Sequence, residues 1–199
     1  MFAEALGVGS FRFDASGIAD SIAFADTAKA WGHTQASIPF RAISTTDIPN
    51  PILLIDELDK AATGNGVNGS LASSLTPFLE RETSARHRDV SLDAEVNLSF
   101  ISYISTANDD SKLPAHIKDR FRVIRMPAPT IEHLPAFAYN IQADKVLQDD
   151  EDVRWIEPLD GDELEVAGKA WAKAKFSMRA LQKIVSATVD ARASFALRH

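Results

Sequence analysis

Hydrophobic positions follow two different patterns along the chain, and the change between them lies near residue 128. In the first part, short apolar runs alternate with segments whose apolar residues recur every three or four positions. The clearest run, over residues 52–55, contains only Ile and Leu, which is typical of a strand buried on both faces of a parallel sheet. Further strands are predicted over residues 11–14, 98–105 and 121–126. Strands that alternate with helices predict an α/β fold.

Helical segments are predicted before, between and after these strands. Pro39, Pro49 and Pro51 are expected to break the stretch before residue 52 into loops and short pieces. The glycine-rich stretch 63–70 is expected to form a loop. Helices are predicted over residues 1–6, 18–31, 71–79, 114–119, 131–147, 162–175 and 177–196.

The sequence Pro127-Ala128-Pro129 marks the predicted domain boundary. After it almost no strand pattern remains, and the acidic run over residues 148–152 is expected to form a solvated loop or a helix start. We therefore predict an α/β core over residues 1–128, followed by a small all-helical domain over residues 129–199.

Composition narrows the class of protein. The 199 residues are 45% apolar and 25% charged, and no stretch reaches the length of about 18 apolar residues that a membrane span needs. Cysteine is absent, which excludes disulfides, thiolate catalysis and Cys-ligated zinc. The net charge of −7 disfavours broad binding to nucleic acid, which depends on neutralising phosphates. With no pattern of a signal peptide over residues 1–6, a cytoplasmic location is the simplest expectation.

The strongest chemical pattern is the acidic pair Asp56-Glu57, which directly follows the strand over residues 52–55. Four apolar residues followed by Asp-Glu form the Walker B pattern. The carboxyl end of such a strand opens at the ligand-binding edge of a parallel sheet. There Asp56 could hold Mg²⁺, usually through water, and Glu57 could polarise a water that attacks a phosphate. The alternative is an acidic turn in which Asp56 caps a helix.

A second strand also ends in a polar residue. Residues 98–105 run into Thr106-Ala107-Asn108, and a parallel neighbour would bring Asn108 to the same edge as Asp56 and Glu57. A neutral amide there could orient the attacking water or contact the γ-phosphate without adding charge. Taken alone, an Asn after a strand is more often a turn residue.

Two arginines complete the set of candidates. Arg120 precedes the strand predicted over 121–126, where its guanidinium could reach a neighbouring subunit's nucleotide; a surface salt bridge is the alternative, and Arg122 ranks second. Arg179 lies in the first turn of the last predicted helix, with Ser177 as a plausible N-cap. A cation in the first turn opposes the helix dipole, which suggests another reason for its placement.

Taken in order, these segments resemble the ATPase module of Lon-type AAA+ proteins. The similarity extends from about Ala3 to about Val189. It rests on the segments ILLIDELDK (52–60), STAN (105–108), PAHIKDRFRVI (114–124) and FSMRAL (176–181).

The resemblance implies a role for each candidate. Asp56 and Glu57 match Walker B, Asn108 matches sensor 1, Arg120 matches the arginine finger, and Arg179 matches the sensor 2 arginine of the helical lid. It also implies ATP and Mg²⁺ as cofactors, and self-association into a ring, usually a hexamer, that hydrolyses ATP to pull or remodel protein substrates. Membrane and nucleic-acid partners are not expected.

One element of that family is missing from the sequence. A P-loop needs Gly-x-x-x-x-Gly-Lys-Ser/Thr, and the only Gly-Lys pair, Gly168-Lys169, lacks both the upstream Gly and the hydroxyl residue. Either the chain is a fragment or has a misplaced start, or the protein is natural and degenerate; the first is favoured because the other nucleotide-site residues are intact. This chain alone is expected to bind ATP weakly or not at all.

Two further departures concern substrate handling. No clean aromatic-apolar-Gly pore loop is found, and Trp31 and Phe40 are each better interpreted as buried aromatics. No Ser/Lys protease domain follows residue 199, so proteolysis is not supported. The leading hypothesis is an ATPase module that remodels proteins, and the alternative is a non-hydrolysing assembly module of the same shape. A nucleic-acid loader is a third, less favoured hypothesis.

Overall fold

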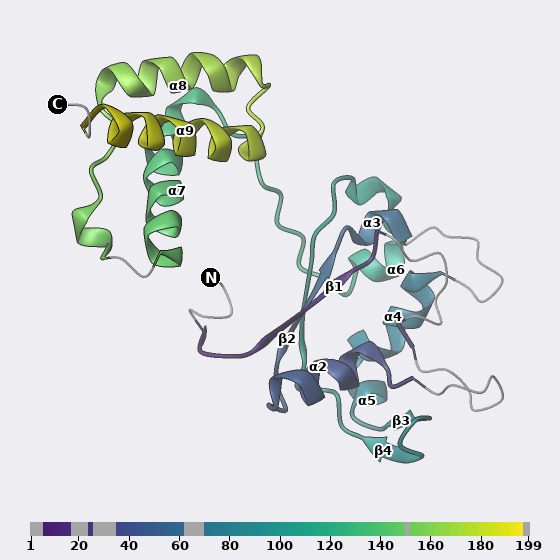
Figure 1. The fold of residues 1–199 in the computed structure, drawn as a ribbon. Helices are drawn as coiled ribbons and strands as arrows, with labels where there is room; N and C mark the ends of the chain where they lie inside the picture. Colours follow the sequence, from purple (N-terminus) through teal and green to yellow (C-terminus); the bar gives the residue numbers. More distant parts are fainter. Residues whose placement is uncertain (1–5, 17–23, 26–34, 62–69, 150–151, 197–199) are drawn as a thin grey trace. The chain divides into compact units, whose positions relative to one another are not determined.

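The computed structural model divides the chain into two compact units, Met1–Val123 and Ile124–His199 (Figure 1). Each unit has its own hydrophobic core. The structure describes residues 6–16, 24–25, 35–61, 70–149 and 152–196. Most of the helices predicted over 1–6 and 18–31, the loop over 63–70 and Trp31 lie outside these ranges.

The first unit is built on three parallel strands, β1 (Ser10–Asp14), β2 (Ile52–Asp56) and β5 (Ser102–Ser105). Their order is β1-β2-β5, so the apolar strand β2 is central, and all its pairings are parallel. The predicted strands over 11–14 and 52–55 are confirmed. The predicted strand over 98–105 is shorter, because the Asn97 side chain accepts hydrogen bonds from the backbone N–H and hydroxyl of Ser99 and holds a local turn.

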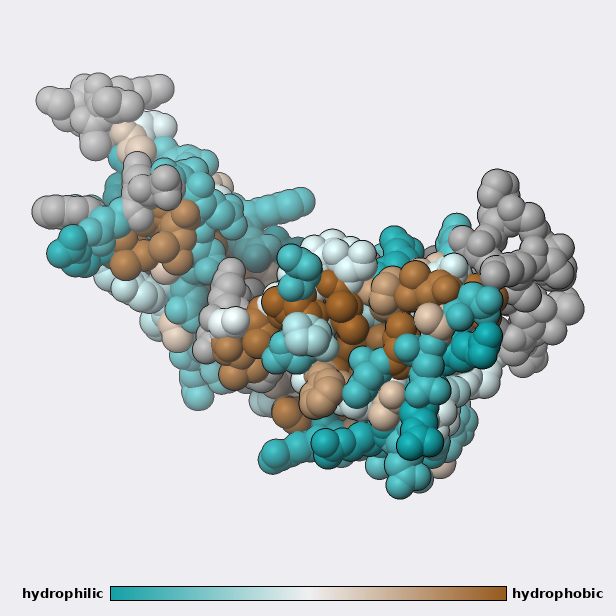
Figure 2. All heavy atoms as spheres, turned by 90° about the horizontal axis from the view of Figure 1, so that it is seen from below, coloured by the Kyte–Doolittle hydropathy of each residue, from teal (hydrophilic) through white to brown (hydrophobic). Residues whose placement is uncertain are grey.

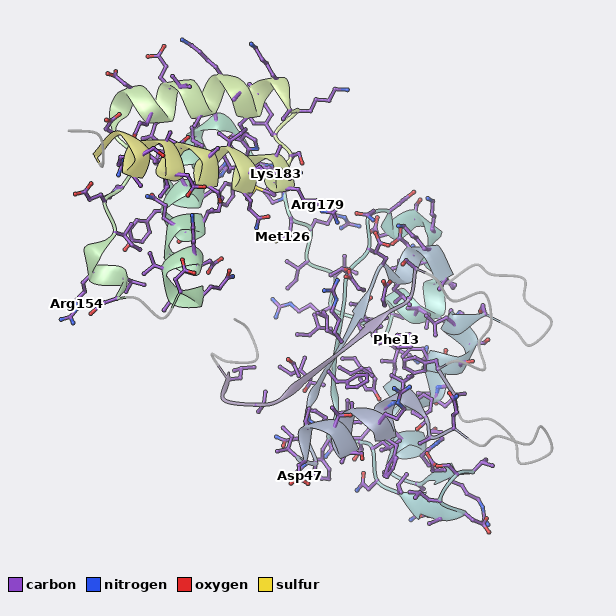
Figure 3. All side chains as sticks on the ribbon, in the orientation of Figure 1. Phe13, Asp47, Met126, Arg154, Arg179 and Lys183 are labelled. Atoms are coloured by element: carbon purple, nitrogen blue, oxygen red, sulfur yellow. The ribbon has the colours of Figure 1, made fainter. Side chains whose placement is uncertain are left out.

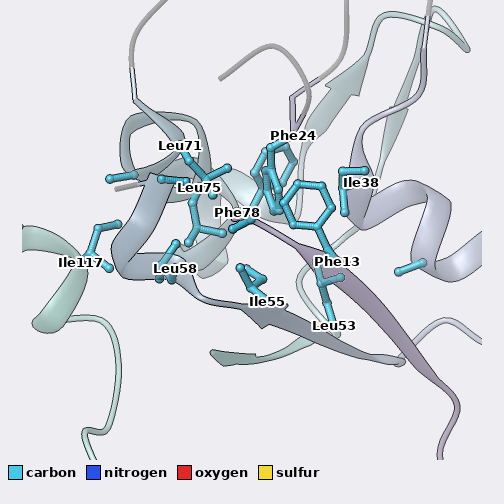
Figure 4. Packing of buried hydrophobic residues seen from close by; sticks show 14 of the residues in the cluster. Phe13, Phe24, Ile38, Leu53, Ile55, Leu58, Leu71, Leu75, Phe78 and Ile117 are labelled. Carbon is cyan, nitrogen blue, oxygen red and sulfur yellow. The ribbon is translucent and has the colours of Figure 1, made fainter. Parts of the chain in front are cut away.

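Helices cover the face of the sheet that carries Leu53 and Ile55 (Figures 1 and 4). Both side chains are fully buried. Phe24 lies between the rings of Phe13 and Phe78 in edge-to-face contacts, with centroids 5.2 and 5.7 Å apart. The covering helices are α2 (Ile38–Thr46), α3 (Leu58–Ala61), α4 (Leu71–Leu79) and α6 (Ala115–Lys118), and the short helix α5 (Arg81–Ser84) follows α4.

Helix α2 forms where the prolines predicted loops and short pieces. Ser37 caps it by accepting a hydrogen bond from the Phe40 N–H at 3.4 Å, and Pro39 lies in the first turn. A proline is tolerated there because a first-turn N–H has no partner within the helix. Phe40 is partly buried against the core, as its sequence context suggested.

A small hairpin, β3 (His87–Asp89) and β4 (Ala94–Val96), was not predicted. Its anchor is the fully buried Asp89, which accepts hydrogen bonds from the Ser91 N–H at 2.9 Å and from the Ser37 N–H at 3.3 Å. Burial by itself raises the pKa of Asp89, but the hydrogen bonds from Ser91, Leu92 and Ser37 outweigh it and hold the pKa below its ordinary value. The carboxylate therefore joins the hairpin to the start of α2.

The strand predicted over residues 121–126 is wrong. The short 3-10 helix η3 (Asp110–Lys112) precedes α6. After α6, residues 122–130 are irregular, and Ile124 and Met126 are 73% and 85% exposed. A strand needs a neighbouring backbone to satisfy its hydrogen bonds, and in the described part of the sheet β5 pairs only with β2. Apolar alternation alone could not supply that partner. Other hydrophobic residues also reach the surface, as Figure 2 shows on one side of each unit.

The second unit is helical, as predicted. Its core is formed by Trp171, Leu181 and Val185, with Phe137 and Phe176 placing their rings edge-to-face against Trp171. No helix in the described residues is long and apolar enough to cross a membrane. The elements are η4 (Ile131–His133), α7 (Leu134–Gln148), η5 (Val153–Trp155), α8 (Gly161–Lys173) and α9 (Met178–Ala196).

Candidate nucleotide site at the carboxyl ends of the strands

The three parallel strands end at one edge of the sheet. Asp14 is in register with Asp56, and Ile55 with Ser105. Backbone hydrogen bonds continue beyond the strands, from the Ala15 N–H to the Asp56 carbonyl and from the Thr106 N–H to the Ile55 carbonyl, both at 3.0 Å. The polar residues that follow the strands are therefore held by the sheet itself, at the edge where open α/β sheets bind ligands.

Asp56 is held in its ionised form by two neighbours. The Thr106 hydroxyl donates a hydrogen bond to Oδ1 at 2.5 Å, and the Arg12 guanidinium on β1 forms an ion pair with Oδ2. The hydroxyl of Thr106 and then the guanidinium of Arg12 lower the pKa of Asp56 below its ordinary value. An ionised, partly exposed carboxylate at a strand end is suited to a hard cation such as Mg²⁺.

Glu57 marks a sharp change in chain direction. Its φ of 55° lies in the left-handed region that residues with a side chain rarely adopt. Its N–H donates to the Thr106 hydroxyl at 3.0 Å, and the next N–H, of Leu58, donates to the Thr106 carbonyl at 2.9 Å. Its carboxylate accepts a hydrogen bond from Lys60 Nζ at 2.6 Å. Glu57, the residue predicted to polarise water, therefore has an unusual backbone conformation, and such conformations are often found at functional sites.

Asn108 follows β5 at the same edge, as its place in the sequence predicted. Its backbone N–H donates to Oδ1 of Asp59 at 3.2 Å, and its side chain is exposed. Asp59 belongs to α3 and is only 3% exposed. The contact therefore joins the segment after β2 to the segment after β5.

Sequence reasoning missed Thr106, Asp59 and Arg12. For Thr106 a signal was present, since a hydroxyl residue stands between β5 and Asn108. For Asp59, an acidic residue three positions after Asp56 gave no indication that its side chain would be buried. The contact of Arg12 depends on the register of β1 against β2, which the sequence does not specify.

Arg120 lies just after α6 in the same unit and is paired within the chain. Its Nη1 donates to the His116 carbonyl at 2.7 Å, and its Nη2 forms an ion pair with Glu80. The guanidinium lowers the pKa of the Glu80 carboxyl. In the part of the chain that the structure describes, no hydrogen bond or ion pair joins Arg120 to Asp56 or Glu57.

Arg179 is the second residue of α9 in the helical unit, and it is exposed (Figure 3). Ser177 accepts a hydrogen bond from the Ala180 N–H at 3.4 Å, as expected of an N-cap. The two left-handed residues before it, Lys175 and Phe176, form the turn between α8 and α9. Arg179 therefore lies at a well-defined helix start in a different unit from Asp56.

The residues at this edge fit a magnesium ion that takes one ligand from the protein and most of its ligands from water and substrate. Among the described residues, no cluster of three or more His, Asp or Glu side chains could enclose a metal ion. Asp56 is ionised and the Thr106 hydroxyl is adjacent, which suits Mg²⁺ bound by one carboxylate, with water and substrate oxygens as its other ligands.

Comparison with known proteins decides the family. The model of the AAA family, described as "ATPase family associated with various cellular activities", matches residues 1–128, which is more than half of the chain. The chain belongs to the AAA ATPase family. The three-stranded parallel sheet and its helices agree with the α/β core of a P-loop NTPase.

Within this family, the chain is similar to Lon proteases. It is 31% identical over 147 residues to a protein named mitochondrial Lon protease homolog from Phaeodactylum tricornutum, covering 74% of this chain and 16% of that protein. It is 34% identical over 122 residues to the homolog from Caenorhabditis elegans, covering 61% of this chain and 12% of that protein. The chain thus spans less than a fifth of the length of these relatives, and it is a Lon-like AAA module.

Proposed function

We propose that this AAA module hydrolyses ATP to drive the remodelling or unfolding of proteins within a ring assembly. The observation that carries the proposal is the shared edge of Asp56, Glu57 and Asn108 at the ends of neighbouring parallel strands. Acidic and amide groups of this kind at one sheet edge are suited to holding a metal ion and orienting a water beside a phosphate. Protein remodelling is proposed from the similarity to Lon proteases.

Each residue has a proposed role. Asp56 holds Mg²⁺ through water, and the bound ion would neutralise charge on the phosphates. Glu57 polarises the attacking water, and Asn108 orients that water or contacts the γ-phosphate. Lys60 Nζ donates to Oε2 of the Glu57 carboxylate at 2.6 Å, so the water would be polarised by Oε1, or by a carboxylate that Lys60 has released.

The two arginines are proposed to act on phosphate charge from other parts of the assembly. Arg120 would leave its ion pair with Glu80 and reach a nucleotide bound by a neighbouring subunit. Arg179 would contact the nucleotide from the helical unit. A hexameric ring is proposed for the complete protein from the resemblance to Lon-type AAA+ proteins, and a head-to-tail interface that shares a site between subunits can close into such a ring.

A mixing experiment tests the shared site. It uses a version of the protein that carries a Walker A segment grafted from a relative ahead of Met1. Glu57→Gln and Arg120→Ala variants should each lose ATP turnover. Mixed rings should regain part of it, because some interfaces combine an intact Glu57 with an intact Arg120. If Arg120→Ala alone retains normal turnover, the role in a neighbouring site is wrong.

The 199 residues taken alone are proposed to bind ATP weakly. They contain no glycine-rich loop followed by Lys and Ser or Thr, which in P-loop proteins supplies backbone N–H groups and an ammonium to the phosphates. Isothermal titration with Mg²⁺ and ATP should give no tight binding to this chain, and tight Mg²⁺-dependent binding would contradict the proposal.

A second candidate is a non-hydrolysing assembly module with the AAA fold. It is favoured by the pairing of both carboxylates with cations of the same chain, Asp56 with Arg12 and Glu57 with Lys60. The Glu57→Gln variant separates the two candidates in cells. Loss of function supports ATP hydrolysis, and unchanged function, with no ATP turnover in either the wild type or the variant, supports the assembly module.

The compartment is also a proposal. The sequence favours the cytoplasm, whereas the Lon protease homologs from Phaeodactylum tricornutum and Caenorhabditis elegans are named as mitochondrial proteins. Fractionation of cells that express a tagged chain distinguishes the two locations.

A further inference from the structure

Arg12 gives the candidate metal site a cation of its own. It lies on β1 opposite Leu54 of β2, two positions before the pair Asp14 and Asp56. Arg12 and Asp56 point to the same face of the sheet, since side chains alternate along parallel strands in register. The guanidinium reaches Oδ2 of Asp56 from the neighbouring strand.

The two oxygens of Asp56 have different partners. Oδ1 accepts the hydrogen bond of the uncharged Thr106 hydroxyl, and only Oδ2 faces a full positive charge. The Arg12 side chain is 68% exposed and that of Asp56 is 24% exposed. A long, solvated side chain can leave such a contact at small cost, because exposed ion pairs contribute little to stability.

The charge of Arg12 nevertheless opposes a second cation at the same carboxylate. A guanidinium in contact with Asp56 cancels most of the field that would attract Mg²⁺, and it repels the ion directly. The other cation nearby, Lys60, is already bonded to Glu57, so it does not replace Arg12 at Asp56.

We propose that Arg12 is an internal counter-cation that occupies Asp56 until Mg²⁺ displaces it. This inference rests on the proposed role of Asp56 as the magnesium residue. Arg12 thus sets the metal concentration at which the site becomes competent. It is a positioning and regulatory residue, because no step of hydrolysis requires it to touch the nucleotide.

Manganese titration of the 199-residue chain tests this inference by NMR. Mn²⁺ prefers the same oxygen ligands as Mg²⁺ and broadens nearby amide signals, so weak binding is detectable. The reporters are the amides of Glu57, Leu58 and Thr106. Arg12→Gln removes the charge and Arg12→Lys retains it. Arg88→Gln is the matched control, because it removes one exposed arginine that pairs with Asp93 at 2.8 Å in the same unit.

Half-maximal broadening should occur at about three- to tenfold lower Mn²⁺ in Arg12→Gln than in the wild type. Arg12→Lys and Arg88→Gln should resemble the wild type. Equal titrations of Arg12→Gln and wild type would overturn the inference and leave the magnesium site standing. No broadening near Asp56 in any variant would overturn the inference, because no metal ion would then compete with Arg12 for Asp56 in this chain.

Solvent exchange of the Arg12 guanidinium in the wild-type chain gives a second test of the displacement. The Nη–H signals of Arg12 should exchange faster with solvent as Mg²⁺ is added, because Nη2 of the displaced guanidinium no longer donates to Asp56. Unchanged Arg12 exchange at Mg²⁺ concentrations that shift the Glu57 amide would show that the ion and the guanidinium bind together, which overturns displacement.

Discussion

A single hydroxyl group, that of Thr106, connects the two acidic residues at the end of the sheet. It donates to Asp56 at 2.5 Å and accepts from the Glu57 N–H at 3.0 Å. The same residue continues the backbone pairing of β5 with β2. Thr106 therefore fixes both the charge of Asp56 and the unusual backbone of Glu57.

Replacing this hydroxyl should weaken the site without unfolding the sheet. Thr106→Val retains the shape but removes both hydrogen bonds, so the pKa of Asp56 should rise towards its ordinary value of 3.8. Because the pKa of Asp56 is lower in the folded state than in the unfolded state, its ionised carboxylate stabilises the fold at any pH above the ordinary value. This stabilisation is lost as the pH falls through the lowered pKa. The variant should therefore be less stable at pH 7 by about 1 kcal/mol, with the difference shrinking below about pH 4.

An NMR titration of the Asp56 carboxyl measures its pKa, and urea unfolding at pH 7 and below about pH 4 measures the loss of stability. Thr106→Ser retains the hydroxyl and is the matched control. An unchanged Asp56 titration in Thr106→Val would mean that the hydroxyl does not hold the carboxylate.

The sequence predicted which residues lie at the ends of the strands better than it predicted the side chains that these residues contact. The positions of Asp56, Glu57 and Asn108 after two apolar runs were enough to place them at one edge, because parallel strands share their carboxyl ends. The contacts of Arg12 and the buried Asp59 depend on register and on helix packing, which a local pattern does not encode.

At the scale of elements, the central strand β2 is asymmetric. Leu53 and Ile55 are fully buried under the helices, whereas Leu54, between them, is only partly buried. The continuous apolar run predicted burial on both faces. In the described residues the helical layer lies on one face of the sheet only (Figure 1). The apolar run therefore predicted the strand correctly, but it did not show that helices cover only one of its faces.

Two truncations on this strand measure the asymmetry. Leu53→Ala should lower the free energy of unfolding by about 2–5 kcal/mol, as is usual for a fully buried leucine. Leu54→Ala, one position away and identical in chemistry, should cost less than half as much. Urea denaturation followed by circular dichroism compares them, and equal losses would show that the second face is packed as tightly as the first.

Elements that depend on tertiary contacts were the hardest to predict. The hairpin β3–β4 rests on the buried Asp89, whose bonds reach Ser37 about fifty positions away. Residues 121–126 have the apolar pattern of a strand but no partner strand in the described sheet. In contrast, α8 and α9 carry local signals, such as the capping box of Asp160 and Glu163, and both were predicted closely.

At the scale of the whole molecule, the two units have separate cores. The second unit surrounds Trp171, which is fully buried and donates through its indole N–H to the Ser177 carbonyl at 3.0 Å. An ion pair of Arg192 with Glu163 and a hydrogen bond of Gln142 to the Glu157 carbonyl lie within the same unit. The members of this core among the described residues all belong to the second unit.

The segment Ile124–His199 is therefore expected to fold when expressed alone. It should show helical circular dichroism and a cooperative thermal transition of modest stability, as is usual for a domain of this size. Trp171→Ala should abolish the transition, since losing a buried tryptophan costs about 3–5 kcal/mol. A gradual, non-cooperative melt of the unmodified segment would show that the helical unit depends on the first unit.

Single-turnover hydrolysis shows whether the acidic strand end belongs to an ATP-hydrolysing site. In a version carrying a Walker A segment, Glu57→Gln is compared with Glu82→Gln, a matched change at an exposed glutamate of the same unit. We expect Glu57→Gln to retain ATP binding and to slow hydrolysis by about a hundredfold or more, and Glu82→Gln to leave both unchanged. Hydrolysis by Glu57→Gln at the wild-type rate would contradict the claim.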